Sequence, residues 1–161
     1  TEYIQDERVG LVVGSASALP FPPHSFDTIA CWEVLEHLPE SGVGHFFSEA
    51  KRVLKPGGSF YLSTPHHSLA STALDPARWL IGHRHYSLTR VRSFAEACGF
   101  TVASLHMAGG WWEILGWWNL YTAKWIFRRR PFFADAMDRK IDGDFRSGSG
   151  FTNVFCKMVA V

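Results

Sequence analysis

Hydrophobic positions along the chain follow two periodicities, and these predict the elements of the fold. Short runs rich in apolar residues are typical of strands, and the run at 26–32 is of the kind buried on both faces of a sheet. Five such runs span residues 9–13, 26–32, 59–64, 100–107 and 153–161. Apolar residues spaced by three and four predict a helix over 43–54, ended by Pro56-Gly57-Gly58, and a second helix between Ser87 and Gly99. This alternation indicates an α/β layered domain with parallel strands.

Three segments depart from the alternation. Residues 19–23 hold three prolines in four positions, so we expect a loop there. The polar, glycine-rich residues 142–150 predict a second loop. Residues 111–127 contain five tryptophans, but their polar residues do not fall on one stripe, so a clean amphipathic helix is not expected. This aromatic segment is interpreted as a buried helix, a lid over substrate, or a segment lying in a membrane interface with 128–130 at the headgroups.

Composition and charge narrow the class of protein. The 161 residues suffice for one domain, and 47% hydrophobic with 19% charged residues is an ordinary globular balance. A net charge of +1 argues against a nucleic-acid partner bound through a broad basic face. The three cysteines are far apart without CxxC pairing, which favours reduced thiols and a cytoplasmic location. No apolar run is long enough to cross a bilayer.

Four short motifs follow one another between residues 19 and 58. They read Leu-Pro-Phe at 19–21, Ser-Phe-Asp at 25–27, Glu-Val-Leu-Glu-His-Leu at 33–38 and Arg-Val-Leu-Lys-Pro-Gly-Gly at 52–58. In this order and spacing they resemble the class I, Rossmann-like S-adenosylmethionine-dependent methyltransferases of type 11, which include the ubiquinone-biosynthesis O-methyltransferases. His-Arg-His-Tyr-Ser at 83–87 and Gly-Phe at 99–100 extend the resemblance to about residue 107.

The resemblance implies an α/β, Rossmann-like sheet that is mostly parallel with an antiparallel last strand. That family has a glycine-rich turn after its first strand, and the glycines at 42–44 and 148–150 are wrongly placed for it. We therefore expect the N-terminal strands to be missing and residues 1–161 to form a single incomplete methyltransferase domain. Residues 108–150 are expected to form an aromatic, lid-like insertion within it. The isolated chain should bind S-adenosylmethionine weakly and be inactive.

Ligands of open α/β sheets bind outside the carboxyl ends of the strands. By resemblance, Ser15 and Ala16 border the adenine ring of S-adenosylmethionine, and Cys31, Trp32 and Glu33 face its methionine and sulfonium end. Ser15 stands where the family usually has an aspartate, and a neutral hydroxyl is a weaker acceptor than a carboxylate. Ordinary turn chemistry is the alternative interpretation of this serine.

Glu33, Glu36 and His37 share one face if this stretch forms a helical turn. We expect His37 to be the catalytic base for the acceptor hydroxyl, with Glu36 beside it. Alternatively, Glu36 caps the turn and His37 packs against a loop. The pattern is also similar to the divalent-metal element of small-RNA 2′-O-methyltransferases, but no metal is included in the predicted site. Such a metal would need one more ligand, and the available imidazoles are His66, His67 and His85.

The resemblance implies methyl transfer from S-adenosylmethionine to a small-molecule or lipid-like acceptor, with oxygen as the expected position. The expected partners are this acceptor and, through the aromatic segment, a membrane surface, but no nucleic acid. The alternative is a degenerate methyltransferase fold that acts as a non-catalytic binding module. The missing glycine-rich turn favours that alternative if the chain is a whole protein.

Overall fold

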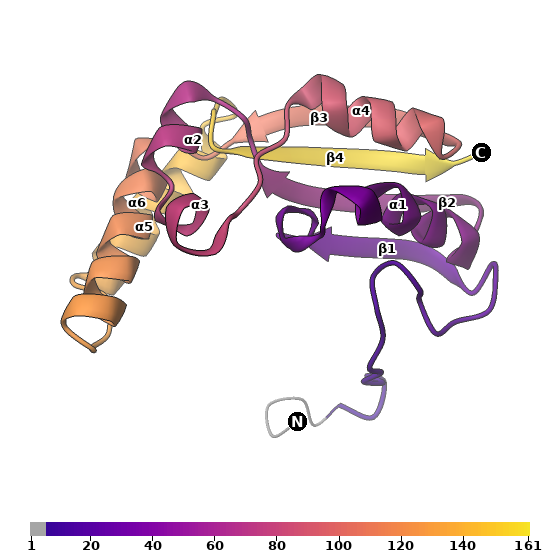
Figure 1. The fold of residues 1–161 in the computed structure, drawn as a ribbon, viewed down its shortest axis with the longest axis horizontal. Helices are drawn as coiled ribbons and strands as arrows, with labels where there is room; N and C mark the ends of the chain where they lie inside the picture. Colours follow the sequence, from indigo (N-terminus) through magenta and orange to yellow (C-terminus); the bar gives the residue numbers. More distant parts are fainter. Residues whose placement is uncertain (1–5) are drawn as a thin grey trace.

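A computed structural model describes residues 6–161, which form one mixed four-stranded sheet with helices (Figure 1). The strands are β1 (Phe26–Trp32), β2 (Leu54–Pro65), β3 (Phe100–Ala108) and β4 (Asn153–Ala160). Their order in the sheet is β1-β2-β4-β3. β1 and β2 are parallel, and β4 runs antiparallel to both β2 and β3. The predicted sheet, mostly parallel with an antiparallel last strand, is confirmed.

The hydrophobic core lies between the sheet and two helices, α1 (Val43–Val53) and α4 (Leu88–Ala97). Phe47 of α1 is fully buried against Phe60 of β2, and Val91 of α4 is fully buried in the same cluster. α4 begins as expected, because the Ser87 hydroxyl accepts a hydrogen bond from the Arg90 amide at 3.2 Å. Gly99 follows the helix in a left-handed conformation, with φ 79°.

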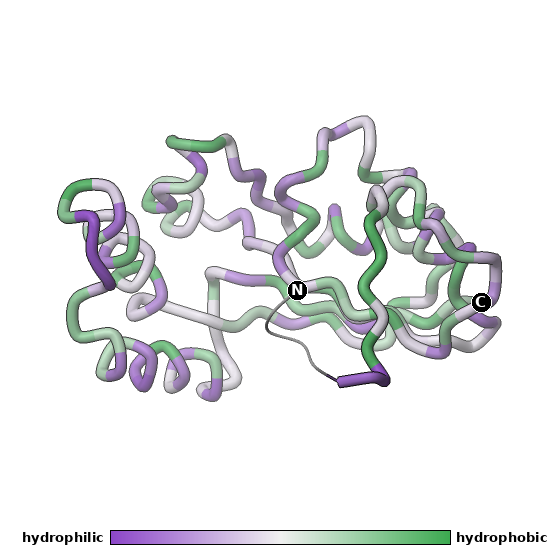
Figure 2. The backbone as a smooth tube through the Cα atoms, turned by 90° about the horizontal axis from the view of Figure 1, so that it is seen from below, coloured by the Kyte–Doolittle hydropathy of each residue, from purple (hydrophilic) through white to green (hydrophobic). Residues whose placement is uncertain are grey.

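The remaining helices cluster beyond the carboxyl ends of β1, β2 and β3 (Figure 1). In the described part of the chain, two 3-10 turns precede α1, and four helices and a π-helical turn make up the rest of this group. These are the 3-10 turns Leu35–His37 and Glu40–Gly42, α2 (Leu69–Leu74), α3 (Pro76–Ile81), α5 (Trp111–Tyr121), a π-helical turn (Thr122–Ile126) and α6 (Ala134–Arg146). α5 and α6 pack together as a hairpin at the end of the molecule away from the C-terminus (Figure 2). No helix among residues 6–161 is long and apolar enough to span a membrane.

Three expectations about elements were wrong. Residues 9–13 form no strand: Val13 is fully exposed, and no strand of the described residues lies beside this run to pair with it. β1 is not buried on both faces, because it is an edge strand here and alternate residues reach solvent. Residues 142–146 belong to α6, so the loop begins only at Ser147. This helix continues because Asp144 accepts from the Trp112 amide at 2.8 Å and Phe145 meets Phe155 edge-on.

Candidate functional site

A cavity of about 380 Å³ lies at the carboxyl ends of the parallel strands. The strand register builds its floor, because Trp32 of β1 pairs with Ser63 of β2, and Ser63 pairs with Phe155 of β4. Side chains at paired positions stand on the same face of a sheet. α5 and α6 supply the opposite wall. The aromatic lining consists of Trp32, Trp117, Phe145 and Phe155, and the carboxylates are Glu33 and Glu113.

Glu33 follows β1 directly and turns the chain, with a left-handed φ of 53°. Its amide donates to the Ser63 carbonyl at 3.2 Å, and its carboxylate accepts from the Ser63 hydroxyl at 2.5 Å. The side chain reaches solvent, yet the partial removal of water around it raises the pKa of Glu33. The hydrogen bond from Ser63 and the charge of His37 oppose that rise. Glu33 is therefore fixed in place at the mouth of the cavity.

Glu113 is the buried carboxylate of the site, 9% exposed. Asn153 donates its side-chain amide to one oxygen at 2.7 Å, and the Thr152 hydroxyl donates to the other. Gly109 makes room for this arrangement, since a Cβ there would come within 2.0 Å of the carboxylate. Burial raises the pKa of Glu113 to about 7, and repulsion from Glu33 acts in the same direction. The two hydrogen bonds lower this pKa and only partly offset the effect of burial. Glu113 is a site residue that was not predicted, although a single acid within an apolar run of the sequence is a signal for a buried carboxylate.

Glu36 and His37 lie beside this cavity but do not line it. Glu36 is 1% exposed and accepts from the Thr64 hydroxyl at 3.2 Å. Burial raises the pKa of Glu36 to about 7, with repulsion from Glu33 in the same direction. One Glu36 oxygen lies 3.8 Å from Nε2 of the exposed His37. Because Glu36 is buried, it can act on a ligand only through His37.

The other three predicted cofactor residues lie away from the cavity. Ser15 is exposed and its hydroxyl accepts a hydrogen bond from the Ser17 amide at 3.3 Å. This is the ordinary turn chemistry that was the alternative interpretation of this serine. Ala16 packs at the margin of the core. Cys31 packs against the same core, and burial raises the pKa of its thiol to about 11. The structure thus brings Trp32 and Glu33 to the cavity but not Ser15, Ala16 or Cys31, whose cofactor roles stay predictions.

Within residues 6–161, no group of three His, Cys, Asp or Glu side chains is placed to hold a metal ion. Glu33 accepts its hydrogen bond from Ser63 and Glu36 accepts one from Thr64, so each carboxylate has a partner of its own.

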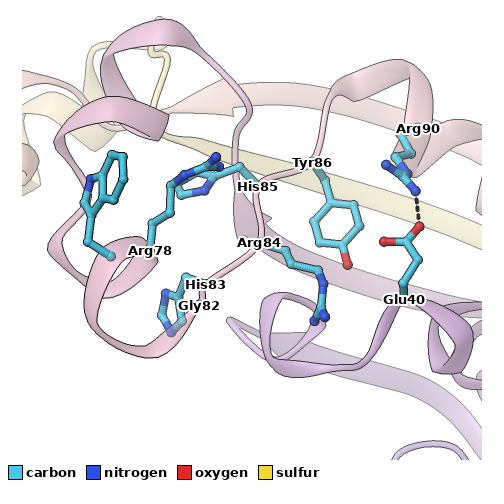
Figure 3. Close-up of a pocket in the computed structure, with 9 residues that line it drawn as sticks. Glu40, Arg78, Gly82, His83, Arg84, His85, Tyr86 and Arg90 are labelled. Atoms are coloured by element: carbon cyan, nitrogen blue, oxygen red, sulfur yellow. Dashed lines mark hydrogen bonds and ion pairs between the residues drawn. The ribbon is translucent and has the colours of Figure 1, made fainter.

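A second cavity, of about 440 Å³, is lined by the histidine-rich segment that extends the family resemblance (Figure 3). Arg78, Arg84 and Arg90 surround it, and Arg90 pairs with Glu40. His85 is buried here with its Nε2 3.4 Å from Asp75, and burial lowers the pKa of His85 to about 4, with Arg78 contributing. His85 is therefore neutral at physiological pH, and the positive charge of this cavity comes from its arginines.

Part of the sequence is similar to that of known methyltransferases. A family model described as a methyltransferase domain matches residues 1–62. Over 106 residues the chain is 33% identical to the protein named "Probable S-adenosylmethionine-dependent methyltransferase" of Mycolicibacterium smegmatis, covering 63% of this chain and 40% of that protein. The ubiquinone biosynthesis O-methyltransferase of Xanthomonas euvesicatoria is 42% identical over 52 residues, 32% of this chain and 21% of that protein. The 27-O-demethylrifamycin SV methyltransferase of Amycolatopsis mediterranei is 40% identical over 57 residues, 35% of this chain and 20% of that protein.

Solved structures share the fold. Phosphoethanolamine N-methyltransferase 2 of Haemonchus contortus superimposes with a TM-score of 0.62 at 20% identity, over 96% of this chain and 38% of that one. Geranyl diphosphate C-methyltransferase of Streptomyces coelicolor gives 0.60 at 15% identity, over 93% and 52%. The sheet and its carboxyl-end cavity thus define a Rossmann-like methyltransferase fold. Over part of its length the chain is similar in sequence to S-adenosylmethionine-dependent methyltransferases, and it spans 40% or less of the length of the three curated relatives named above.

Proposed function

We propose that the protein carrying this chain transfers a methyl group from S-adenosylmethionine to an oxygen of a small-molecule or lipid-like acceptor. The observation that carries the proposal is the carboxyl-end cavity, where Glu33 and Glu113 face an aromatic-lined volume. Transfer to oxygen is supported by the O-methyltransferase named among the similar proteins. We place this activity in the cytoplasm, where thiols stay reduced, because the cysteines of the chain are unpaired: Cys31, Cys98 and Cys156.

The residues at the end of β1 fit the donor. S-adenosylmethionine carries a sulfonium cation, and cations are stabilised by carboxylates and by the faces of indole rings. Trp32 is 52% exposed beside Glu33, and none of the ion pairs within residues 6–161 neutralises Glu33. We assign Trp32 and Glu33 to the sulfonium end and Ser15 and Ala16 to the adenine end. When bound, the cofactor supplies an electrophilic methyl group.

The cavity walls fit an apolar or aromatic acceptor. Trp117, Phe145 and Phe155 present flat apolar surfaces that orient such a molecule and exclude water. The acceptor hydroxyl must lose its proton during transfer. We propose His37 as the group that takes it, oriented by the buried Glu36. Glu113 is the competing base, because it lines the cavity itself and its pKa is raised to about 7.

Calorimetry with two ligands, on the protein that carries this chain, tests the donor site. S-adenosylmethionine is a sulfonium cation, whereas S-adenosylhomocysteine is a neutral thioether. Glu33→Gln should therefore weaken binding of S-adenosylmethionine by about tenfold and leave S-adenosylhomocysteine within about twofold. Glu96→Gln, at an exposed position of α4, is the control and should change neither affinity. Equal losses for both ligands would place the sulfonium away from Glu33.

Methyl transfer itself is tested with labelled S-adenosylmethionine and a panel of phenols and alkyl alcohols. Labelled methyl ethers are the expected products. A protein that binds the cofactor but methylates no member of the panel would favour the non-catalytic binding module. The rate of transfer at saturating acceptor separates the two bases: His37→Gln should lower it strongly if His37 takes the proton, and Glu113→Gln should do so if Glu113 takes it.

A further inference from the structure

One surface of the helical end combines exposed apolar side chains from two elements, α3 and the end of α5 with the turn that follows. We call residues 76–82 and 118–130 the α3–α5 surface. Trp79 and Ile126 are each 71% exposed, and Trp125 is 60% exposed. The two elements meet around a groove of about 290 Å³ whose lining is almost wholly apolar. Large exposed apolar patches are rare unless they bind something.

The groove has a fixed geometry. The Trp118 indole donates a hydrogen bond to the Leu74 carbonyl at 3.0 Å, which ties α5 to the last residue of α2. The Trp79 indole likewise donates to the Ala73 carbonyl at 3.1 Å. Both rings are thus held by their polar nitrogens while their apolar faces stay open to solvent. Tryptophan in this state, apolar on one side and hydrogen-bonded on the other, is enriched at membrane–water interfaces.

The charge of the surface is one-sided. Its two segments contain five cations and no aspartate or glutamate, whereas the whole chain has a net charge of only +1. The five cations are Arg78, Lys124, Arg128, Arg129 and Arg130. Trp79 also borders the arginine-lined second cavity, and Arg78 lies there with Arg84 and Arg90 (Figure 3), so basic side chains continue beyond the groove. Apolar anchors next to a cluster of basic residues match the chemistry of an anionic bilayer surface.

A second copy of the chain fits this surface poorly. A two-fold contact would set five cations against five, with no acid from either segment between them. That repulsion disfavours self-association, whereas anionic phosphates would be attracted by the same charges. The cations and the exposed indoles therefore both favour an anionic bilayer surface over a second copy of the chain.

We propose that the α3–α5 surface binds the surface of a bilayer containing anionic phospholipids. Trp79, Trp125 and Ile126 enter the boundary between headgroups and acyl chains. Arg128, Arg129 and Arg130 lie against the lipid phosphates. The binding is peripheral and does not depend on methyl transfer, so it can be tested without an acceptor.

The test is sedimentation of the chain with vesicles of phosphatidylcholine, with and without about one-third phosphatidylglycerol. Binding to the anionic vesicles should be at least tenfold stronger, and raising the salt concentration should weaken it. Trp125→Glu with Ile126→Glu should reduce it by at least tenfold. The apolar control is Val161→Glu, which changes an exposed residue at the opposite end of the molecule and should bind like wild type (Figure 1).

Two triple variants that lose the same charge show whether binding depends on the arginines of this surface or only on the net charge of the protein. Replacing Arg128, Arg129 and Arg130 with glutamine should remove most of the preference for anionic vesicles. Replacing three arginines elsewhere removes the same charge and should not; this control changes Arg8, Arg92 and Arg146. Equal loss in both triple variants would overturn the proposal, as would wild-type binding that is insensitive to phosphatidylglycerol and salt. The proposal would also be overturned if the protein does not bind vesicles but self-associates in sedimentation velocity, and if Trp125→Glu abolishes that self-association. The salt series uses wild-type protein, so it decides even if a variant fails to fold.

Discussion

At the scale of single residues, the cavity carboxylates are held by neutral donors rather than by cations. Glu113 receives hydrogen bonds from Asn153 and Thr152, and Glu33 receives one from Ser63. Neutral donors fix the position of a carboxylate but stabilise its charge less than a lysine or arginine would. This is why burial dominates and raises the pKa of Glu113 to about 7. The arrangement leaves negative charge available for a cationic ligand.

The raised pKa of Glu113 has a consequence for stability. Its pKa is about 7 in the folded protein against an ordinary 4.5, so the folded state binds more protons between these values. The free energy of unfolding must then fall as pH rises from about 4.5 to 7. We expect Glu113→Gln to remove about 1–3 kcal/mol of that fall, because the glutamine does not titrate. Glu36 titrates in the same window, so part of the slope will remain.

Urea denaturation at pH 5, 6, 7 and 8 would measure this effect. Glu96→Gln, exposed on α4, should follow the wild-type slope. A Glu113→Gln protein that loses stability with pH as steeply as wild type would contradict the burial argument.

The sequence identified some site residues and missed others for a physical reason. Glu33, Glu36 and His37 are close in sequence, so one motif contained them. Glu113 belongs to the site through Asn153, which is 40 positions away and meets it only because β4 returns through the sheet. No local pattern encodes that contact. Spacing along the chain also does not fix where each carboxylate finds its hydrogen bond, since Glu33 accepts from Ser63 and Glu36 from Thr64.

At the scale of elements, the bounds of a strand or helix were predicted accurately where its own sequence pattern determined them. The strands near 26–32 and 100–107 and the helix after Ser87 were all found at nearly their observed bounds. α6 was missed because Gly143 and the glycines after it suggested a loop. Its pattern was nevertheless readable, since Met137, Ile141 and Phe145 recur every four residues. What the sequence could not show is that α5 would lie against these side chains.

The close packing of α5 on α6 depends on Gly116. A Cβ at this position would lie 2.7 Å from Cδ1 of Ile141. Gly116→Val should therefore push the hairpin apart and cost about 1–3 kcal/mol of stability, measured by urea denaturation. Gly143 offers the matched control, because a Cβ there meets nothing within 4 Å. Gly143→Val should stay within about 0.5 kcal/mol of wild type. Similar costs at the two glycines would show that the hairpin contact is loose.

At the scale of the whole molecule, α5 connects two surfaces with different chemistry. One side of the helix closes the carboxyl-end cavity through Glu113 and Trp117. Another side contributes Trp118 to the groove of the α3–α5 surface. Successive residues of an α-helix point about 100° apart, so neighbouring tryptophans can serve separate surfaces. A membrane-bound orientation through the α3–α5 surface would hold the cavity near the bilayer, where a lipid-like acceptor is concentrated.

This division predicts opposite effects for two adjacent substitutions. Trp117→Ala removes part of the cavity wall, so it should raise the KM for an aromatic acceptor by about tenfold or more while vesicle binding stays unchanged. Trp118→Ala should do the reverse, weakening binding to phosphatidylglycerol vesicles while the KM for a water-soluble acceptor holds. Both variants need a thermal unfolding curve, because Trp117 is the more buried of the two and its loss costs more stability. The decisive quantity is therefore acceptor and vesicle affinity per folded molecule. If the two alanine variants change both affinities together, the aromatic segment acts as one surface and the separate roles assigned to its two sides are wrong.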